Sequence, residues 1–476
     1  MKRWLALAVV AVALAGAAIV AWIAKRPPRT MRVDLLHTGN ATAERFAIDR
    51  VVIEPLTWPG NPSRPIDDTN LGKYAFEVMD GDGRPIYSRG FASVYGEWET
   101  TAEAKEGEKT FSESLRFPTP RGAVRVRVLK RDARNDLHEI WSFSLDPRKT
   151  VVQIARPASP GSVIAIETHG PPADKVDLLI LGDGYTAAER EKFERDARRM
   201  VDVLFSKSPF RERRSDFNVW ALCPPAAESG ISQPSLGIER HSPLGATYDA
   251  FGSERYILTF ENRALREIAS FAPYEFVEIL TNSRQYGGGG IHNLYSIVAA
   301  DNLWAPYVFI HELGHHFAGL ADEYFTSDVA YEGPSERVEP WEPNVTALRD
   351  PASFKWKDLV TPGAPLPTPW SKEEFEARSS SYQKKRRELR AERRPEEEMD
   401  ALSSAERDLE SKLLSSDPNA STVGAFEGAM YEAKGYFRPQ EDCVMFSRDD
   451  VPFCAVCRRA IERVIDLYAR RAPSGP

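Results

Sequence analysis

A short stretch in the second half of the chain places the strictest limit on what this sequence can fold into. Residues 305–324 read APYVFIHELGHHFAGLADEY, so His311 and His315 stand four residues apart and Glu312 lies between them. On an α-helix, side chains four residues apart project from one face, about one turn apart. The flanking residues are mostly apolar, which predicts that this helix is buried in a hydrophobic core.

The two histidines and the glutamate predict a zinc site with hydrolytic chemistry. Imidazole nitrogens bind Zn²⁺ at about 2.0–2.1 Å, and His311 and His315 are within reach of a single ion. Glu312 points beside that face, where its carboxylate can take the proton of a zinc-activated water as the water attacks a carbonyl. A helix can contain this HExxH pattern by chance, but the apolar context and the acidic residues downstream favour a metal site.

A catalytic zinc ion usually has three protein ligands, so a third ligand is expected nearby. Gly319 can end the helix in a left-handed conformation and turn the chain back toward the metal. Asp322 then follows eleven residues after His311, and Glu323 follows twelve. We assign the third ligand to Asp322, with Glu323 as the second choice.

The spacing departs from the metzincin pattern HExxHxxGxxH by one residue. Ala318 and Ala321 stand where that pattern has its glycine and its third ligand. His316 is an alternative ligand or oxyanion donor. Because it directly follows His315 it faces another side of the helix, so we expect it to pack or to support a ligand instead.

The N-terminal part, residues 31–150, predicts a β-sandwich. Val124–Val128 alternates apolar and charged residues, which is typical of a half-buried strand. We expect seven or eight such strands, which would form a sandwich. Because these residues contain no catalytic cluster, we expect an accessory domain with a positioning or binding role. Other strand candidates, separated by Gly, Pro and Asp turns, are residues 50–55, 74–79 and 139–145.

Residues 160–470 predict an α/β domain with a mixed sheet. Val176–Leu181 is a nearly continuous apolar run, as expected of a buried central strand. Thr186 and Glu189 form a capping box at the start of the helix that follows. Further strand and helix candidates alternate along the chain, which favours helices packed on a sheet.

A charged insertion interrupts this domain at residues 372–414. The basic run Lys384–Arg394 is followed by Pro395 and then by the acidic run Glu396–Glu398. Because proline breaks a helix, we expect two exposed helices whose charged side chains pair with each other. One role for these helices is a flap near the active-site cleft.

The first 30 residues predict the compartment. Lys2 and Arg3 precede an uncharged run from Trp4 to Ala24, which is long enough to cross a hydrocarbon core of about 30 Å. The run is either a signal peptide cut near the small residues 15–17 or a retained anchor, and its full length favours the anchor. We therefore expect a membrane-anchored protein with its catalytic domain outside the cytoplasm, or else a secreted or periplasmic one.

The cysteines suggest an oxidising compartment. Cys443, Cys454 and Cys457 cluster near the C-terminus, and Cys223 stands alone. A CxxC pair can hold zinc or carry redox chemistry, but a second pair and nearby histidine ligands are missing. We therefore expect a local disulfide from Cys443 to Cys454 or Cys457.

The stretch 311–324, HELGHHFAGLADEY, resembles the signature of the IgA-peptidase family of zinc metallopeptidases, and the N-terminal β domain resembles that family's accessory domain. The resemblance covers most of the chain except the region near 372–415. It implies a metal-dependent endopeptidase with a metzincin-like catalytic domain, but not that immunoglobulin A is the substrate. Further similar segments are residues 177–189, 228–230, 286–293, 424–431 and 443–457.

Three further features fit that implication. Gly287–Gly290 predicts a flexible loop before a strand over residues 291–300, whose open edge can pair with an extended substrate. Met445 fits a methionine beneath the metal, although an ordinary core methionine fits nearly as well. The candidates for a phenol that stabilises the oxyanion are Tyr324, Tyr431 and Tyr436.

The sequence therefore predicts a Zn²⁺-dependent endopeptidase of mixed α+β or α/β class that acts on protein or peptide substrates. The net charge of −8 argues against a nucleic-acid partner. A membrane contact would come only from the N-terminal segment. Two alternatives are a zinc amidase acting on cell-wall peptides and a non-catalytic surface binding protein with a structural metal, and the intact Glu312 speaks against the second.

Overall fold

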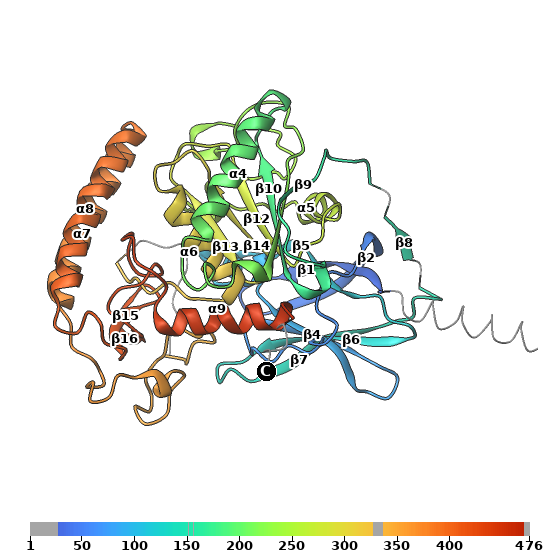
Figure 1. The fold of residues 1–476 in the computed structure, drawn as a ribbon, viewed down its shortest axis with the longest axis horizontal. Coiled ribbons are helices and arrows are strands. Elements are labelled where there is room, and N and C mark those ends of the chain that lie inside the picture. The colour runs from blue at the N-terminus through green and yellow to red at the C-terminus, as the bar shows by residue number, and fades with distance from the viewer. Residues whose placement is uncertain (1–26, 151, 156, 327–336, 471–476) are drawn as a thin grey trace, which may run out of the picture.

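The structure, a computed structural model, describes residues 27–470 except residues 151, 156 and 327–336. It combines several β-sheets with packed helices, so the mixed α and β class is confirmed (Figure 1). The apolar run Trp4–Ala24 lies outside the described residues. Within the described ranges, no helix has both the length and the apolar character needed to cross a membrane.

Two four-stranded sheets form the N-terminal part, and residues of both join one hydrophobic core. In the strand Val124–Arg131, Val124, Val126 and Val128 are buried at every second position, in line with the alternation of the sequence. One sheet contains, in spatial order, β5 (Lys109–Pro118), β1 (Arg29–Gly39), β2 (Glu44–Thr57) and β8 (Val152–Ile154); the other contains β4 (Pro85–Phe91), β3 (Tyr74–Met79), β6 (Val124–Arg131) and β7 (Leu137–Leu145).

A six-stranded sheet forms the centre of the rest of the chain. In spatial order its strands are β13 (Gly288–Ile291), β14 (Tyr295–Ala299), β12 (Phe276–Thr281), β10 (Val176–Asp183), β11 (Phe217–Leu222) and β9 (Ile164–Glu167). The four inner strands run parallel, and the two edge strands run antiparallel to their neighbours. All residues of β10 are buried, as the apolar run predicts for a central strand.

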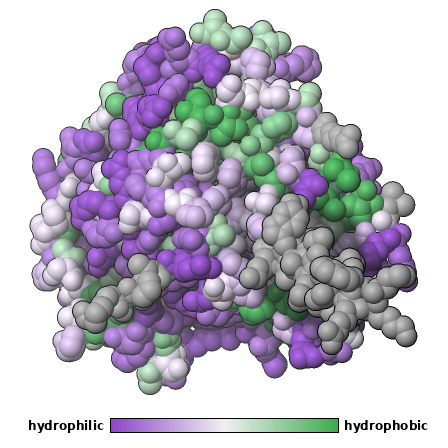
Figure 2. Space-filling model, turned by 45° about the vertical axis from the view of Figure 1, so that its right-hand side comes forward, coloured by the Kyte–Doolittle hydropathy of each residue, from purple (hydrophilic) through white to green (hydrophobic). Residues whose placement is uncertain are grey.

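Alternate residues of β10 contribute to two cores on opposite faces of this sheet. Leu178 and Ile180 pack with the helices α4 (Arg190–Leu204), α6 (Ala305–Ala318) and α9 (Ala455–Tyr468). Leu179 and Leu181 pack with α5 (Asn262–Ala269) on the other face. On the side of the molecule in Figure 2, most exposed residues are hydrophilic and the apolar ones gather in separate patches, as expected when the cores take up most apolar side chains.

The N-terminal part packs directly against the six-stranded sheet. The short helices α2 (Val94–Trp98) and α3 (Ala102–Glu106) lie between β4 and β5 in the chain, and Tyr95 and Trp98 join the core that contains β10 and α5. The backbone amide of Ala92 donates a hydrogen bond of 2.9 Å to the carbonyl oxygen of His292. These contacts place the N-terminal part against the loop between β13 and β14, and His292 of that loop is hydrogen-bonded to the carbonyl of His316 in α6.

The charged insertion forms two antiparallel helices, α7 (Lys372–Ala391) and α8 (Glu396–Ser416), that stand at one side of the molecule (Figure 1). The break falls at Pro395, as predicted. An ion pair of 2.6 Å between Arg390 and Glu396 connects the two helices, and Arg394 in the turn pairs with Glu398 at 2.7 Å, so the expected internal charge pairing is present. A two-stranded sheet of β15 (Phe426–Ala429) and β16 (Glu432–Arg438) follows.

The glycine run before β14 is a strand, so the prediction of a flexible loop at Gly287–Gly290 is wrong. Gly288–Ile291 pairs antiparallel with Tyr295–Ala299 as the edge of the six-stranded sheet. The glycines serve close packing: a Cβ on Gly290 would lie 2.4 Å from the carbonyl oxygen of Glu312 in α6. Only residues without a side chain allow this strand to lie so near the helix backbone.

Candidate metal centre

Helix α6 carries the two histidines, and its C-terminal end turns the chain back toward them. Gly319 adopts the left-handed conformation with φ 58°, and its amide donates a 3.0 Å hydrogen bond to the carbonyl of His315. This is the helix end that the sequence predicts, because glycine enters that region without a steric penalty from a Cβ. The next few residues therefore return past the same face of the helix.

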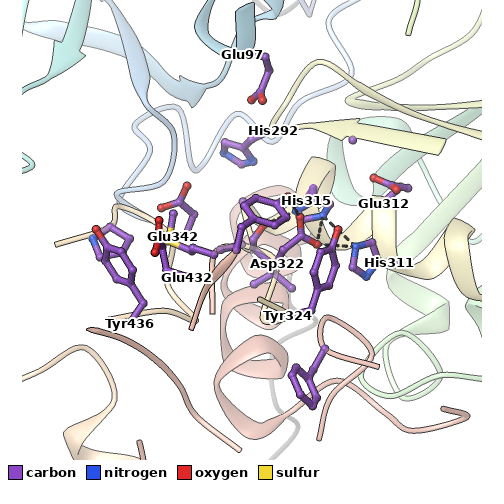
Figure 3. A pocket seen from close by; sticks show the side chains of 18 of the residues that line it. Glu97, His292, His311, Glu312, His315, Asp322, Tyr324, Glu342, Glu432 and Tyr436 are labelled. Carbon is purple, nitrogen blue, oxygen red and sulfur yellow. Dashed lines mark hydrogen bonds and ion pairs between the residues drawn. The ribbon is translucent and has the colours of Figure 1, made fainter. Parts of the chain in front are cut away.

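His311, His315 and Asp322 meet at one point (Figure 3). The Nε2 atoms of the two histidines are 3.2 Å apart. Oδ1 of Asp322 lies 2.9 Å from Nε2 of His311 and 3.3 Å from Nε2 of His315. The arrangement unites two imidazoles and one carboxylate, a donor set that suits a catalytic zinc ion.

The hydrogen bonds on the outer nitrogens of the histidines leave the inner nitrogens free to bind a metal. Nδ1 of His311 lies 3.0 Å from the carbonyl oxygen of Val444, and Nδ1 of His315 lies 2.6 Å from that of Leu320. A carbonyl oxygen only accepts, so each Nδ1 carries the proton and each Nε2 presents a lone pair to the centre. Oδ1 of Asp322 is then buried without a donor among the described residues, which a cation would compensate.

Glu312 is half-buried and lines the same cavity, but it is not one of the three converging side chains. Burial raises the pKa of its carboxyl above the ordinary value, and the neighbouring His311 and His315 oppose that rise. A raised pKa suits a carboxylate that accepts and returns a proton near neutral pH.

The cavity above the three side chains has a volume of about 620 Å³. Parts of the chain that are far apart in the sequence contribute to its walls. Ala92 and Glu97 come from the N-terminal part, Phe375 and Tyr382 from α7, and Tyr431 from the turn between β15 and β16. Figure 3 shows Glu97 above His311, His315 and Asp322, and Glu432 and Tyr436 to one side of them.

The three candidate tyrosines differ in their distance from the centre. The hydroxyl of Tyr431 donates a hydrogen bond to Oδ2 of Asp322. The ring of Tyr324 stacks on His311 with centroids 6.0 Å apart. The hydroxyl of Tyr436 instead accepts from the amide of Val338 at 3.3 Å. Tyr431 and Tyr324 therefore contact Asp322 and His311 directly, and Tyr436 contributes to the cavity wall.

One residue at the centre was missed by the sequence analysis. The hydroxyl of Tyr307 lies 3.3 Å from Nδ1 of His311, next to the hydrogen bond that orients this ring. The signal was present, because Tyr307 precedes His311 by one helical turn and projects from the same face.

His316 and Glu323 both point away from the centre. Nε2 of His316 accepts from the amide of Val277 at 3.1 Å, its Nδ1 lies 3.1 Å from the carbonyl of Ile291, and burial lowers its pKa to about 3. It is a packing residue, as expected. Glu323 accepts a 2.9 Å hydrogen bond from Asn344, so the structure brings Asp322, and not Glu323, to the histidines.

Met445 lies directly beneath α6. A Cβ on Gly314 would come within 2.7 Å of the Met445 sulfur, so the glycine allows this close contact. The backbone of the methionine also supports the loop after α6, because its carbonyl accepts a 2.9 Å hydrogen bond from the amide of Glu323.

The predicted disulfide is wrong, because Cys223, Cys443, Cys454 and Cys457 are all free thiols. The sulfurs of Cys443 and Cys457 are 3.9 Å apart, far beyond the S–S bond length of about 2.05 Å. The three clustered sulfurs instead surround the carboxylate of Glu323. The spacing of the cysteines in the sequence could not predict this contact, because Glu323 is more than a hundred residues away from them.

The tight contact between β13 and α6 predicts the effect of a small substitution. We expect Gly290→Ala to lower the free energy of unfolding by about 1–3 kcal/mol, because the new methyl group would push on the backbone of Glu312. Urea unfolding followed by tryptophan fluorescence measures this change. Gly122→Ala is the control, since a Cβ at that position meets no atom within 4 Å. Equal stabilities of the two variants would contradict the close packing.

Two models of known protein families together match most of the chain. Residues 164–465 match the family model described as IgA Peptidase M64, and residues 25–142 match the model of the Peptidase M64 N-terminus. The first match includes α6, Asp322 and the cysteine cluster. A search of the curated proteins found no match.

Proposed function

Because the chain belongs to the M64 family of peptidases, it is a metallopeptidase, and we propose that it is a zinc-dependent endopeptidase. In this proposal His311, His315 and Asp322 hold the zinc ion and Glu312 is the general base. The observation that carries it is the convergence of the two Nε2 atoms and Oδ1 of Asp322 within 2.9–3.3 Å of one another.

The bound zinc ion would supply a Lewis acid that activates water and polarises the peptide carbonyl. The remaining chemistry belongs to the chain. Glu312 accepts the proton of the attacking water and returns it to the leaving amine. Tyr431 holds the carboxylate of Asp322 in place through its hydroxyl, and the carbonyls of Val444 and Leu320 hold the two imidazoles.

We assign the substrate to the cavity between the edge strand β13 and the N-terminal part. Gly288 and Gly290 of this strand line the cavity, next to Glu312. An extended peptide can add to such an edge through its backbone, which suits an enzyme that cleaves within polypeptides. The segment 255–257 already pairs with Gly288, since the amide of Ile257 donates to its carbonyl at 3.0 Å. The substrate therefore takes the end of β13 at Gly290.

We also propose a catalytic organisation, a domain division and a location for the protein. The catalytic part has a metzincin-like organisation, in which a glycine ends the active-site helix and Met445 lies beneath it. The chain divides into an accessory domain at residues 31–150 and a peptidase domain at residues 160–470. The N-terminal segment, residues 1–30, directs the catalytic domain out of the cytoplasm.

Metal removal tests the proposed cofactor. The full-length chain is purified, its zinc content is measured, and cleavage of a mixed pool of unfolded proteins is followed by mass spectrometry of the new termini. We expect a chelator to abolish cleavage and added Zn²⁺, but not Mg²⁺, to restore it, because imidazole ligands favour zinc over magnesium. Full cleavage by the metal-free protein would contradict the proposal.

A further inference from the structure

A second group of metal-binding side chains lies behind the first. Glu323, Cys443, Cys454 and Cys457 are all buried, and one ligand atom of each lies within 4.8 Å of the others. Glu323 directly follows Asp322, Cys443 lies in the loop between β16 and α9, and Cys454 and Cys457 lie at the start of α9. None of these side chains is one of the three that converge at the first centre.

The separations within this cysteine cluster match four ligands around one ion. Around a tetrahedral Zn²⁺ with Zn–S bonds near 2.3 Å and Zn–O bonds near 2.0–2.2 Å, neighbouring donor atoms stand about 3.5–3.8 Å apart. Sγ of Cys457 lies 3.9 Å from Sγ of Cys443 and 3.3 Å from Oε1 of Glu323. Sγ of Cys454 lies 3.9 Å from the same oxygen. These distances are close to the edges of such a tetrahedron.

Backbone amides donate hydrogen bonds to two of the three sulfurs, those of Cys443 and Cys454. Sγ of Cys443 accepts from the amides of Cys454 at 3.2 Å and Met445 at 3.5 Å. Sγ of Cys454 accepts from the amide of Cys457 at 3.4 Å and caps the N-terminus of α9. The positive end of a helix and amide hydrogen bonds both stabilise the anionic form of sulfur, which is the form that binds metal.

The carboxylate of Glu323 supplies an independent observation. Its Oε2 atom is buried and receives no hydrogen bond from any described residue. An ionised carboxylate beside three sulfurs in a closed interior is costly unless a cation compensates it. The buried Arg438 attracts this carboxylate electrostatically, but it gives its hydrogen bonds to backbone carbonyls, among them those of Glu441 and Gly428.

We propose that Glu323, Cys443, Cys454 and Cys457 bind a second zinc ion, which has a structural role. With four protein ligands this site has no open position for substrate or water. Its place in the fold explains what it stabilises. Glu323 neighbours the ligand Asp322, and the turn after Cys443 supplies the Val444 carbonyl that orients His311. The second ion would hold these two segments together and thereby fix the ligands of the first.

Cobalt substitution tests this proposal by a readout other than activity. Full-length protein is produced with Co²⁺ in place of Zn²⁺, its bound metal is counted, and its absorption spectrum is recorded. We expect two metal equivalents and a thiolate-to-cobalt charge-transfer band in the near ultraviolet. Asp322→Ala should keep this band and lose one equivalent. Cys457→Ser should weaken the band strongly, and Cys223→Ser, which changes the isolated cysteine, should leave both measurements unchanged.

The outcomes separate this site from the proposed catalytic one. A single equivalent with a thiolate band would support the cysteine site and contradict the histidine site. A spectrum without thiolate bands in the wild type and in Asp322→Ala would overturn the second site, whatever the metal count. So would a disulfide among Cys443, Cys454 and Cys457 in intact-mass analysis. Both decisive measurements use proteins with intact cysteines, so they do not depend on the folding of a cysteine variant.

Discussion

Glu312→Gln is expected to lower kcat/KM for peptide cleavage by about 10²–10⁴-fold, the usual contribution of a general base. Glutamine keeps the size of the side chain and its place beside the metal ligands, but its amide cannot take a proton from water. The metal content should stay at the wild-type value, because Glu312 is not among the converging donor atoms. The measurement pairs initial rates on a fluorogenic peptide selected from the cleaved pool with zinc analysis of the same sample.

A control variant and a measurement of bound zinc show whether the loss of activity is due to the missing base. Glu191→Gln changes an exposed glutamate on α4, outside the lining of the cavity, and should retain the wild-type rate. Wild-type activity of Glu312→Gln would contradict the proposal that Glu312 is the general base. Loss of zinc from Glu312→Gln would instead point to a ligand or a structural contribution, since a base alone does not hold the ion.

Asp322→Ala is expected to remove both the metal of the histidine site and the activity. The substitution leaves His311 and His315 as two neutral donors, and the ion loses its only carboxylate ligand at this site. Loss of a partner that merely supports a ligand lowers metal affinity by about 10–100-fold, so loss of the ligand itself should exceed about 100-fold. Equilibrium titration of the apoprotein against a zinc-buffering chelator measures the affinity of each of the two proposed sites, and the expected loss concerns the histidine site alone.

The matched control is Asp408→Ala, which changes an exposed aspartate on α8 and should bind zinc as the wild type does. An unchanged affinity of Asp322→Ala for zinc would show that another side chain is the third ligand. Such a result would return the assignment to the alternatives near the helix end, of which Glu323 was the second choice from the sequence.

The local features of the chain could be read from the sequence because each depends on neighbours within a few residues. The four-residue spacing of His311 and His315 places both on one face of a helix wherever that helix lies. A glycine at 319 ends it, the apolar run Val176–Leu181 becomes the buried centre of a sheet, and Pro395 separates two helices. Backbone geometry and side-chain periodicity determine these elements before any long-range contact forms.

Other features depended on contacts between segments far apart in the chain, and only the tertiary structure decided them. Asp322 and Glu323 are adjacent, yet one meets two histidines of α6 and the other meets three cysteines that lie more than a hundred residues later in the chain. The glycines of β13 form a strand that pairs with β14, and α6 lies so close that a side chain at Gly290 would collide with it. The wall formed by Ala92 and Glu97 depends on how the N-terminal sheets dock. Periodicity along a sequence carries no information about such long-range packing. The sequence therefore predicted which side chains can bind a metal, but only the tertiary structure determined which of them lie together.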